Sequence, residues 1–477
     1  MARSRLTGII LSALALVALS TGGAVRAATS PATNFSPTPD ARCGSGDHPE
    51  ATQGRAPAKD YQSGRALLGY TCNASEISHV GASGGYRVYR YTDSTGHVCA
   101  FYDTTLLFPG NVASAPAGQT GVWVLDMTNP ANPVHTATLS TPAMQSPHES
   151  FSLNVKRGLL GAVFGNPGFD PGQFDLYTVS GDCRHPTLTA SLPMGVLGHE
   201  GSFTPDGNTY YASSLYGHTL TAIDVTNTSL PTIVWTSPEW NVHGMNLSDD
   251  GKTMYFADLG NNGGSFPGSG TDGTKGLTVL DVSQIQARTA NPQVSVISHL
   301  TWPVVSTPQT MLPVTISGHK YLVEVDEFAS GNNVGAARII DIANVKQPKV
   351  ISNMRLAVNS AAARQTDQQS DPGASSGLQG YAAHYCGVPS KVDPGIVACS
   401  FIASGLRVFD IRDPYHPKEI AYFNQPSTTA GATGSPGGAY AMSQPAFDPA
   451  NGQIWYSDGN SGFYVVHLTH GVWPFRT

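Results

Sequence analysis

The chain has 477 residues, of which only 12 % are charged, and it contains 52 glycines and 34 prolines. This balance favours many short strands joined by turns over long charged helices. Its 33 acidic and 26 basic residues give a formal net charge of −7. A surface of this sign repels nucleic acid and anionic lipid headgroups, so we expect no nucleic-acid partner.

The first 27 residues have the pattern of an export signal. Arg3 and Arg5 precede the apolar segment "GIILSALALVALS", and "VRA" then places Ala27 where a signal peptidase would cut. The short apolar core counts against a membrane anchor, and no later stretch is long and apolar enough to span a bilayer. We predict a secreted protein, periplasmic or extracellular, with a flexible leader over residues 28–60, which are rich in Pro, Ser, Thr and Ala.

Six cysteines in an exported chain predict disulfides rather than thiol chemistry. Cys386 and Cys399 lie in "HYCGVPSKVDPGIVACSF", which is typical of two strands around a Pro/Gly turn. We predict a disulfide between them, with Cα atoms about 5.5 to 6 Å apart. Two further pairs are predicted, Cys72–Cys99 and, by elimination, Cys43–Cys183. A cysteine metal site is the alternative, but the sequence has no CxxC motif.

One pattern recurs along the chain: an alternating apolar run that ends in Asp and is followed by a turn that contains Pro. The copies are "GVWVLDMTNPANPV", "LTAIDVTNTSLPTIV", "GLTVLDVSQIQARTANPQV", "ARIIDIANVKQPKV" and "GLRVFDIRDPYHPKEI". The alternation indicates a half-buried strand, and the Asp carboxylate can accept hydrogen bonds from turn amides. The five aspartates are Asp126, Asp224, Asp281, Asp341 and Asp410.

These copies resemble the repeats of the bacterial LVIVD-repeat family, whose members look like secreted β-propellers. The resemblance covers roughly residues 62 to 474 and implies a propeller, but it implies no particular reaction. Two units depart from the pattern, because Ser180 and His467 stand where Asp is expected. We interpret those units as divergent blades.

The repeat unit itself also predicts an all-β propeller. Between the Asp-ending strands each unit supplies a hairpin, as in "GSFTPDGNTYYASS". Four strands in a unit of about 40 to 60 residues are typical of a propeller blade. We predict one domain over residues 61–477 with seven blades, near residues 73–142, 146–194, 198–239, 241–303, 306–359, 380–426 and 439–474.

The last unit is one strand short, while residues 64–71 have a strand pattern ahead of the first unit. We therefore expect residues 64–71 to pair into the last blade, which would join the two ends of the chain and remove an open sheet edge. The alternative is a linear array of small β domains.

A histidine begins the first strand of several units, as in "GHEGSFTPDG" and "VHGMNLSDDG". The first strand of a blade lines the central channel, so residues at this position should converge around the axis. The position holds His148, His199, His243 and His384, and Gln309 and Gln444 occupy it in the fifth and seventh units.

Four imidazoles at one end of the channel would suit a transition metal such as Cu, Fe or Zn. Glu149 and Glu200, each beside a histidine, can orient it or act as a general base. Two alternatives use the same positions. One is a metal-free polar ligand site that includes Gln309 and Gln444, and the other is a structural ring in which each histidine bonds to a backbone carbonyl.

Two classes of function stay open. The first is a secreted enzyme that uses the metal to oxidise or hydrolyse a small organic substrate, by analogy of architecture alone with propellers that hold metals. The second is a non-enzymatic module that binds a small molecule or an extracellular protein through its loops. We expect a monomer in either case, and no GxSxG, HExxH or Walker motif indicates another chemistry.

Overall fold

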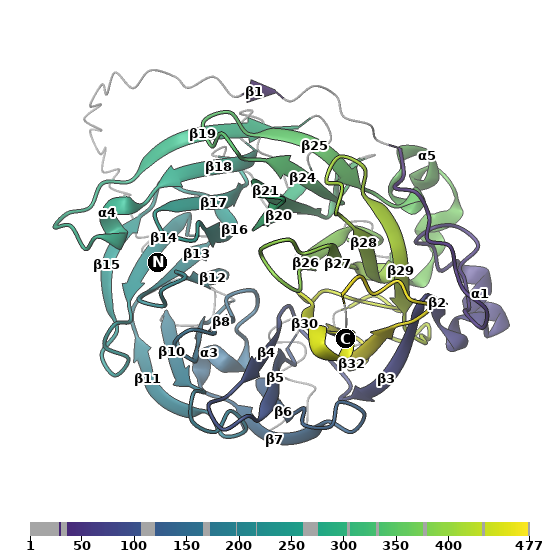
Figure 1. Cartoon of the computed structure of the whole chain (residues 1–477), viewed down its shortest axis with the longest axis horizontal. Helices are drawn as coiled ribbons and strands as arrows, with labels where there is room; N and C mark the ends of the chain where they lie inside the picture. The colour runs from purple at the N-terminus through teal and green to yellow at the C-terminus, as the bar shows by residue number, and fades with distance from the viewer. Residues whose placement is uncertain are drawn as a thin grey trace, which may run out of the picture.

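The computed structural model describes residues 28–29, 36–105, 120–165, 172–196, 198–215, 217–260, 275–302, 306–330, 333–374, 379–431 and 435–475. The predicted export signal, residues 1–27, lies outside these ranges. In the described part, seven blades of four antiparallel strands surround a central axis (Figure 1). The seven-bladed β-propeller predicted from the repeats is therefore confirmed.

Within each blade the first strand lies at the channel and the fourth lies at the outside of the ring (Figure 1). The strands are, blade by blade, β4 (Val88–Thr92), β5 (Val98–Asp103), β6 (Val122–Asp126) and β7 (Val134–Leu139); β8 (Ser152–Asn154), β9 (Leu159–Val163), β10 (Gln173–Thr178) and β11 (Thr187–Pro193); β12 (Glu200–Phe203), β13 (Thr209–Ser214), β14 (Thr219–Asp224) and β15 (Thr232–Ser237); β16 (Val242–Leu247), β17 (Thr253–Asp258), β18 (Gly276–Asp281) and β19 (Ser295–Thr301); β20 (Thr307–Ile316), β21 (His319–Glu327), β24 (Ala337–Asp341) and β25 (Lys349–Met354); β26 (Ala383–Gly387), β27 (Ile396–Phe401), β28 (Gly405–Asp410) and β29 (Lys418–Asn424); β30 (Ala446–Asp448), β31 (Gln453–Asp458), β32 (Gly462–Leu468) and β3 (Ala74–Val80). Outside the blades, β22 (Ala329–Ser330) pairs with β23 (Asn333–Val334), and β1 (Ala28–Thr29) pairs in parallel with β19.

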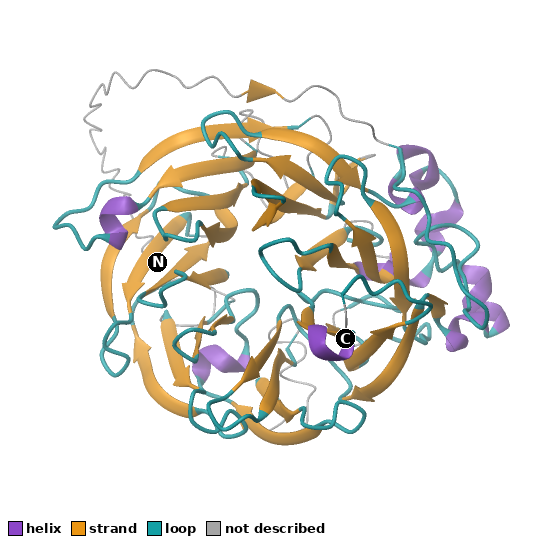
Figure 2. Cartoon of the chain, viewed as in Figure 1, coloured by secondary structure: helices purple, strands orange, loops and turns teal. Residues whose placement is uncertain are grey.

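The helices are short. Those in the described ranges are α1 (Ala58–Ser63), α3 (Pro142–Gln145), α4 (Ser283–Gln286) and α5 (Ala361–Arg364), and α1, α4 and α5 lie at the outer edge of the ring (Figures 1 and 2). Among the described residues, no helix has the length and apolar character needed to cross a membrane.

The core lies between neighbouring blades. Every residue of β9 and β13 is buried, whereas the first two residues of the outer strands β7 and β15 are exposed. For example, Tyr211 of one blade belongs to the same buried cluster as Met245 and Phe256 of the next blade. The middle strands are apolar on both faces because each face packs against a different blade, and this packing keeps the channel-lining ends of the blades in fixed positions.

The repeated aspartates stabilise the turn that follows the third strand, as their pattern predicted. Asp126 Oδ1 accepts a hydrogen bond from the Thr128 amide at 2.9 Å, and Asp224 Oδ1 accepts one from the Thr226 amide at 2.8 Å. The same contact to the amide two residues later is made by Asp281, Asp341 and Asp410.

An N-terminal strand closes the ring in the last blade, as expected, but it is a different segment from the one predicted. β3 pairs with β32, with Ala74 opposite Leu468. Residues 65–68 form a 3₁₀ helix, η1 (Arg65–Leu68), and β2 (Tyr70–Cys72) pairs with β29 as a fifth strand of blade six. The prediction for residues 64–71 is therefore wrong. Asn73, with φ at 52°, bends the chain between β2 and β3, and the strand pattern did not show this bend.

Residues 36–57 were expected to belong to a flexible leader, but in the structure they pack along blades five and six. The Thr38 amide donates to the Arg355 carbonyl at 2.7 Å, and Glu50 pairs with the buried Arg407 at 2.7 Å. Cys43 forms a disulfide with Cys72. The composition of this segment is typical of a linker. Composition alone does not predict bonds to residues that are distant in the sequence.

All six cysteines form disulfides. Cys386–Cys399 links β26 to β27 as predicted, with Cα atoms 4.0 Å apart rather than the expected 5.5 to 6 Å. The other two pairs are Cys43–Cys72 and Cys99–Cys183, so the predicted Cys72–Cys99 and Cys43–Cys183 pairs are wrong. Cys72 lies on the strand added to blade six, whereas Cys99 lies in β5 of blade one, so the predicted partners belong to different blades. Three disulfides indicate an oxidising compartment, outside the cell or in a periplasm.

Candidate metal centre

The innermost strands of the seven blades begin at the same end of the channel, and this end collects the polar residues that the sequence singled out. His148 and Glu149 precede β8, and His199 precedes β12. His243 lies in β16 and His384 lies in β26. The structure brings these residues together with Gln309 from β20, which the sequence also placed at the channel position.

The Glu149 carboxylate lies at the middle of the group and is 2 % exposed. Its Oε2 atom is 3.0 Å from Nε2 of His199 and 3.5 Å from Nε2 of His243. Its Oε1 atom is 3.2 Å from Nε2 of His384 and accepts a hydrogen bond from the Gln309 amide. His148 is more distant, with Nδ1 4.0 Å from Oε2.

Glu327, at the end of β21, supplies a second carboxylate that the sequence analysis missed. Its Oε2 is 3.0 Å from Nε2 of His384, and its Oε1 is 3.5 Å from Nε2 of His243. Glu327 lies in a second strand and therefore outside the repeated channel position. One feature of the sequence could have indicated Glu327: the acidic "EVDE" ends a strand whose preceding residues are largely apolar. Ionisable residues are rarely buried without a partner, so acidic residues in such a strand suggest a nearby positive group.

Two of the histidines are oriented by the backbone of the next blade. His243 Nδ1 donates to the Pro308 carbonyl at 2.7 Å, and His384 Nδ1 donates to the Met442 carbonyl at 2.7 Å. A carbonyl can only accept, so Nδ1 carries the proton in both rings and Nε2 faces the carboxylates. Histidines that bind metals are oriented in this way, because a bond at one nitrogen fixes the lone pair on the other.

Arg87 and Glu200 form a buried ion pair at 2.6 Å beside this group, and the two side chains are 6 % and 1 % exposed. Arg87 also donates to the Gln444 side chain and, at 3.2 Å, to the Glu149 carbonyl, and its guanidinium stacks on the Tyr385 ring. Gln444 therefore contacts Arg87 rather than the histidines. Arg87 directly precedes β4, which is the channel position of blade one. It was missed because blade one was predicted to begin near residue 73, whereas residues 74–80 belong to blade seven.

Burial and close charges shift the pKa values of the group in opposite directions. Burial raises the pKa of Glu200 to about 8 despite Arg87. Burial also favours a high pKa for Glu149, but the histidines around it, His199 first, hold that pKa well below its usual range. Burial lowers the pKa of His384, yet the Glu149 and Glu327 carboxylates raise it to about 9. The two carboxylates therefore require a positive charge between them, either a proton on His384 or a cation.

The contacts of Glu149 have the spacing of donor atoms that share a metal ion. Nitrogen and oxygen ligands about 2.0 to 2.2 Å from one ion lie about 3.0 to 3.5 Å from each other, and the contacts around Glu149 fall in that range. The donor atoms of His148, Glu149 and His199 all lie within 4.8 Å of one another. Among the described residues, five buried atoms of this group make no hydrogen bond: His148 Nδ1, Glu149 Oε2, His199 Nε2, Glu200 Oε2 and Gln309 Oε1. Buried polar atoms in proteins normally have a hydrogen-bond partner. A bound ion or its water ligands would give these atoms a partner.

Comparisons with known proteins identify no family: no family model and no curated protein matches the chain. Many solved structures match at the level of the fold. They include the Pseudomonas aeruginosa periplasmic gluconolactonase PpgL (14 % identity, 80 % of this chain and 89 % of that chain, TM-score 0.45) and the Kuenenia stuttgartiensis hydrazine synthase (10 %, 81 % and 96 %, TM-score 0.47). A protein from Lactobacillus plantarum matches with 14 % identity over 73 % of this chain and 87 % of that chain, with a TM-score of 0.48. Identities this low say nothing about chemistry.

The fold and the channel residues together define the class: a disulfide-bonded seven-bladed β-propeller with a buried His/Glu cluster at one end of its channel. The name metal centre is used below for His148, Glu149, His199, His243, Glu327 and His384.

Proposed function

We propose that the protein is a secreted β-propeller of the LVIVD-repeat type that binds one transition-metal ion at the metal centre. We further propose that it uses this ion to oxidise or hydrolyse a small organic substrate. One observation carries the proposal: the Nε2 atoms of His243 and His384, fixed by Nδ1–carbonyl bonds, face the same two buried carboxylates.

The donor set determines which ions fit. Imidazole nitrogens from His199, His243 and His384 with carboxylate oxygens from Glu149 and Glu327 suit Zn, Fe or Cu better than Ca or Mg, which prefer oxygen ligands alone. A divalent cation would also balance the two carboxylates, so that neither histidine between them has to be protonated.

Each side chain near the ion has a separate role in this proposal. The bound ion would supply Lewis-acid or redox chemistry. Glu149 lies among the donors and would hold the ion. The side-chain amide of Gln309 would orient the Glu149 carboxylate by donating a hydrogen bond to it. Glu200 is turned toward Arg87 and stays available as the candidate general acid or base.

Elemental analysis of the purified mature protein tests this proposal. We expect about one transition-metal ion per chain, because His243 and His384 share the same two carboxylates, Glu149 and Glu327. The His243→Ala/His384→Ala variant should lose the ion and keep nearly all of its β-sheet circular dichroism, since the blades are held by packing and strand ladders. The matched control is His319→Ala/His416→Ala, which removes two exposed histidines that contact Tyr321 and Asp413 rather than the metal centre and should retain the ion.

Two outcomes would contradict the metal centre: wild-type protein without a transition metal after refolding in its presence, or full retention of the ion by the His243→Ala/His384→Ala variant. The metal-free binding module would then be the better account of the cluster.

A further inference from the structure

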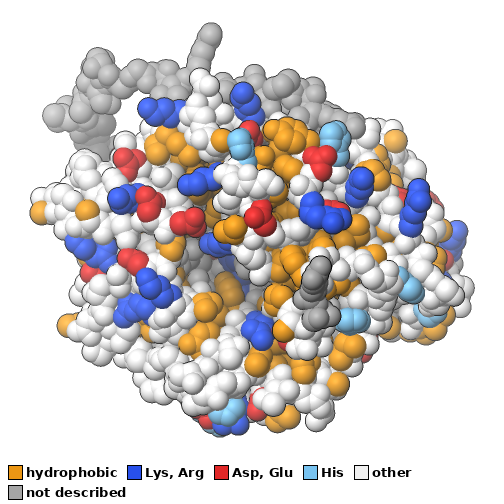
Figure 3. All heavy atoms as spheres, in the orientation of Figure 1, with side chains coloured by type: hydrophobic (Ala, Val, Ile, Leu, Met, Phe, Trp, Pro, Cys, Tyr) orange, Lys and Arg blue, Asp and Glu red, His pale blue; other side chains and the backbone are white. Residues whose placement is uncertain are grey.

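The opposite end of the channel is open. The innermost strands that begin at the metal centre end around a cavity of about 500 Å³, which we call the funnel. Its lining includes Arg87, Asn154, Lys156, Asn246, Lys391 and Gln444. A hollow is visible at the middle of the ring on the face shown in Figure 3, with Lys and Arg side chains around it. The volume falls in the range of small-molecule sites, about 300 to 1,000 Å³.

The funnel is basic in an acidic protein. The whole chain has 33 acidic and 26 basic residues, yet the described residues that line the funnel include three basic side chains and no acidic one. Lys156 and Lys391 are exposed at its rim. Within the described part of the chain, neither lysine forms an ion pair. Positive groups that converge on a concave surface raise the local concentration of anions.

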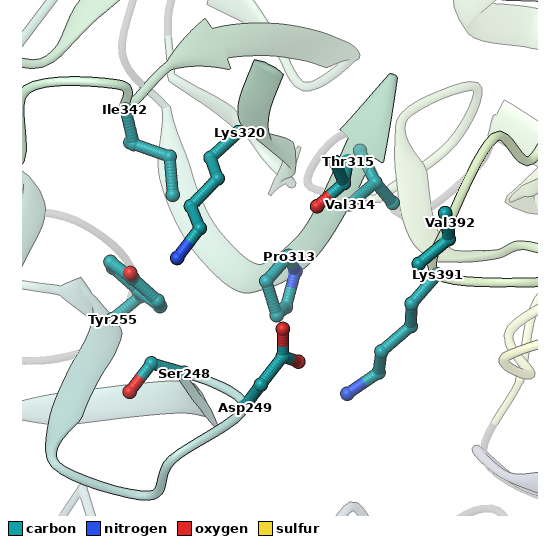
Figure 4. Close-up of a pocket in the computed structure, with 10 residues that line it drawn as sticks. All are labelled: Ser248, Asp249, Tyr255, Pro313, Val314, Thr315, Lys320, Ile342, Lys391 and Val392. Atoms are coloured by element: carbon teal, nitrogen blue, oxygen red, sulfur yellow. The ribbon is translucent and has the colours of Figure 1, made fainter. Parts of the chain in front are cut away.

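A second, smaller pocket adjoins the funnel and shares Lys391 (Figure 4). Lys320 and Lys391 both extend into the space beside Asp249, the one acidic residue among those that line this pocket (Figure 4). The acidic side chain therefore offsets part of the charge at one side of the rim, and Lys156 lies away from this pocket.

The floor of the funnel is connected to the metal centre by Arg87. Its guanidinium lines the funnel, pairs with Glu200 and bonds to the Glu149 carbonyl. A molecule that reaches the floor would therefore lie one side chain away from the metal centre. Asn246, Ser152 and Ser202 add amide and hydroxyl groups to the wall.

We propose that the funnel binds a small organic anion, a carboxylate or a phosphate ester that carries several further hydrogen-bonding groups. The charged group would lie between Lys156 and Lys391, and the polar remainder would extend toward Arg87 and Gln444. This proposal goes beyond the metal centre, because the binding groups are on the chain itself and no ion is needed.

Calorimetric titration of the full mature protein, treated with chelator so that no metal contributes, tests the proposal. The probes are citrate and glucose 6-phosphate, with glucose as the neutral counterpart. We expect one saturable site for at least one anion, no measurable binding of glucose, and weaker binding as salt is raised. The Lys156→Glu/Lys391→Glu variant should lower the affinity by about tenfold or more, because it replaces two charge-assisted contacts with repulsion.

The matched control, Lys346→Glu/Lys349→Glu, makes the same change in net charge at exposed positions on blade five outside the funnel. It should change the affinity by less than about twofold, because salt screens distant charges. Binding of citrate alone or of glucose 6-phosphate alone would support the site and identify its anion. Binding of neither anion, equal binding of glucose, or equal weakening by the control would overturn the proposal, and none of these results bears on the metal content.

Discussion

The two ends of the central channel differ in burial and in charge, although innermost strands such as β8, β12 and β16 run from one end to the other. At the metal centre, Glu149 and Glu327 are 2 % and 3 % exposed and are surrounded by histidines. At the funnel, Lys156 and Lys391 are exposed and no acidic side chain is among the described residues of the wall. In the proposals above, the first end has the groups that would hold a cation, and the second has the groups that would hold an anion. The side chains at the two ends of an innermost strand can therefore differ in charge and polarity, while the strand between them keeps its place in the blade.

Arg87 lies at the boundary between the two ends, so its replacement should have the largest effect. We expect Arg87→Met to lower the free energy of unfolding by about 3 to 5 kcal/mol, because Glu200 would be left buried without its partner. Urea denaturation of the metal-free protein would measure the loss.

The Arg87→Met/Glu200→Leu variant is the control for this prediction. It removes both charges and should recover most of the stability. A single variant as stable as the wild type would show that the ion pair does not hold the two ends together.

A smaller effect is expected at Gly244, where blade four meets the metal centre. A Cβ atom there would lie 2.0 Å from the Gln309 carbonyl oxygen and 2.1 Å from Glu200 Oε2, so the backbone between two blades would have to move. We expect Gly244→Ala to cost about 1 to 3 kcal/mol in unfolding free energy and to weaken metal retention, while funnel binding changes little.

Gly181→Ala is the matched substitution, because a Cβ atom at that position meets nothing within 4 Å. It should leave both stability and metal retention unchanged. Equal behaviour of the two alanine variants would mean that the close approach of Gly244 to Glu200 is unimportant for the centre.

Much of the fold was predictable from local pattern. The alternation that ends at Asp126, Asp224 and their equivalents marks the third strand and its turn, and both depend on residues close in sequence. The order of the blades then placed His199, His243 and His384 at one end of the channel, because a closed ring brings equivalent positions together.

The failures concern contacts between distant segments. The bend at Asn73 assigns residues 74–80 to blade seven, so Arg87 was overlooked as the channel residue of blade one. Glu327 reaches the metal centre from a second strand, which no repeat position indicates. The Cys99–Cys183 disulfide joins two neighbouring blades and depends on their relative position, which spacing in the sequence does not determine.

Anomalous X-ray diffraction from crystals of the metal-loaded protein, collected at the absorption edge of the bound metal, would show whether the metal centre holds the ion. We expect one strong peak in the channel, with Nε2 of His199, His243 and His384 and a Glu149 oxygen about 2.0 to 2.2 Å away. A channel without a peak would overturn the proposal, and so would a strongest peak at the group of Asp93, His97 and Asp182, which also has the spacing of metal ligands.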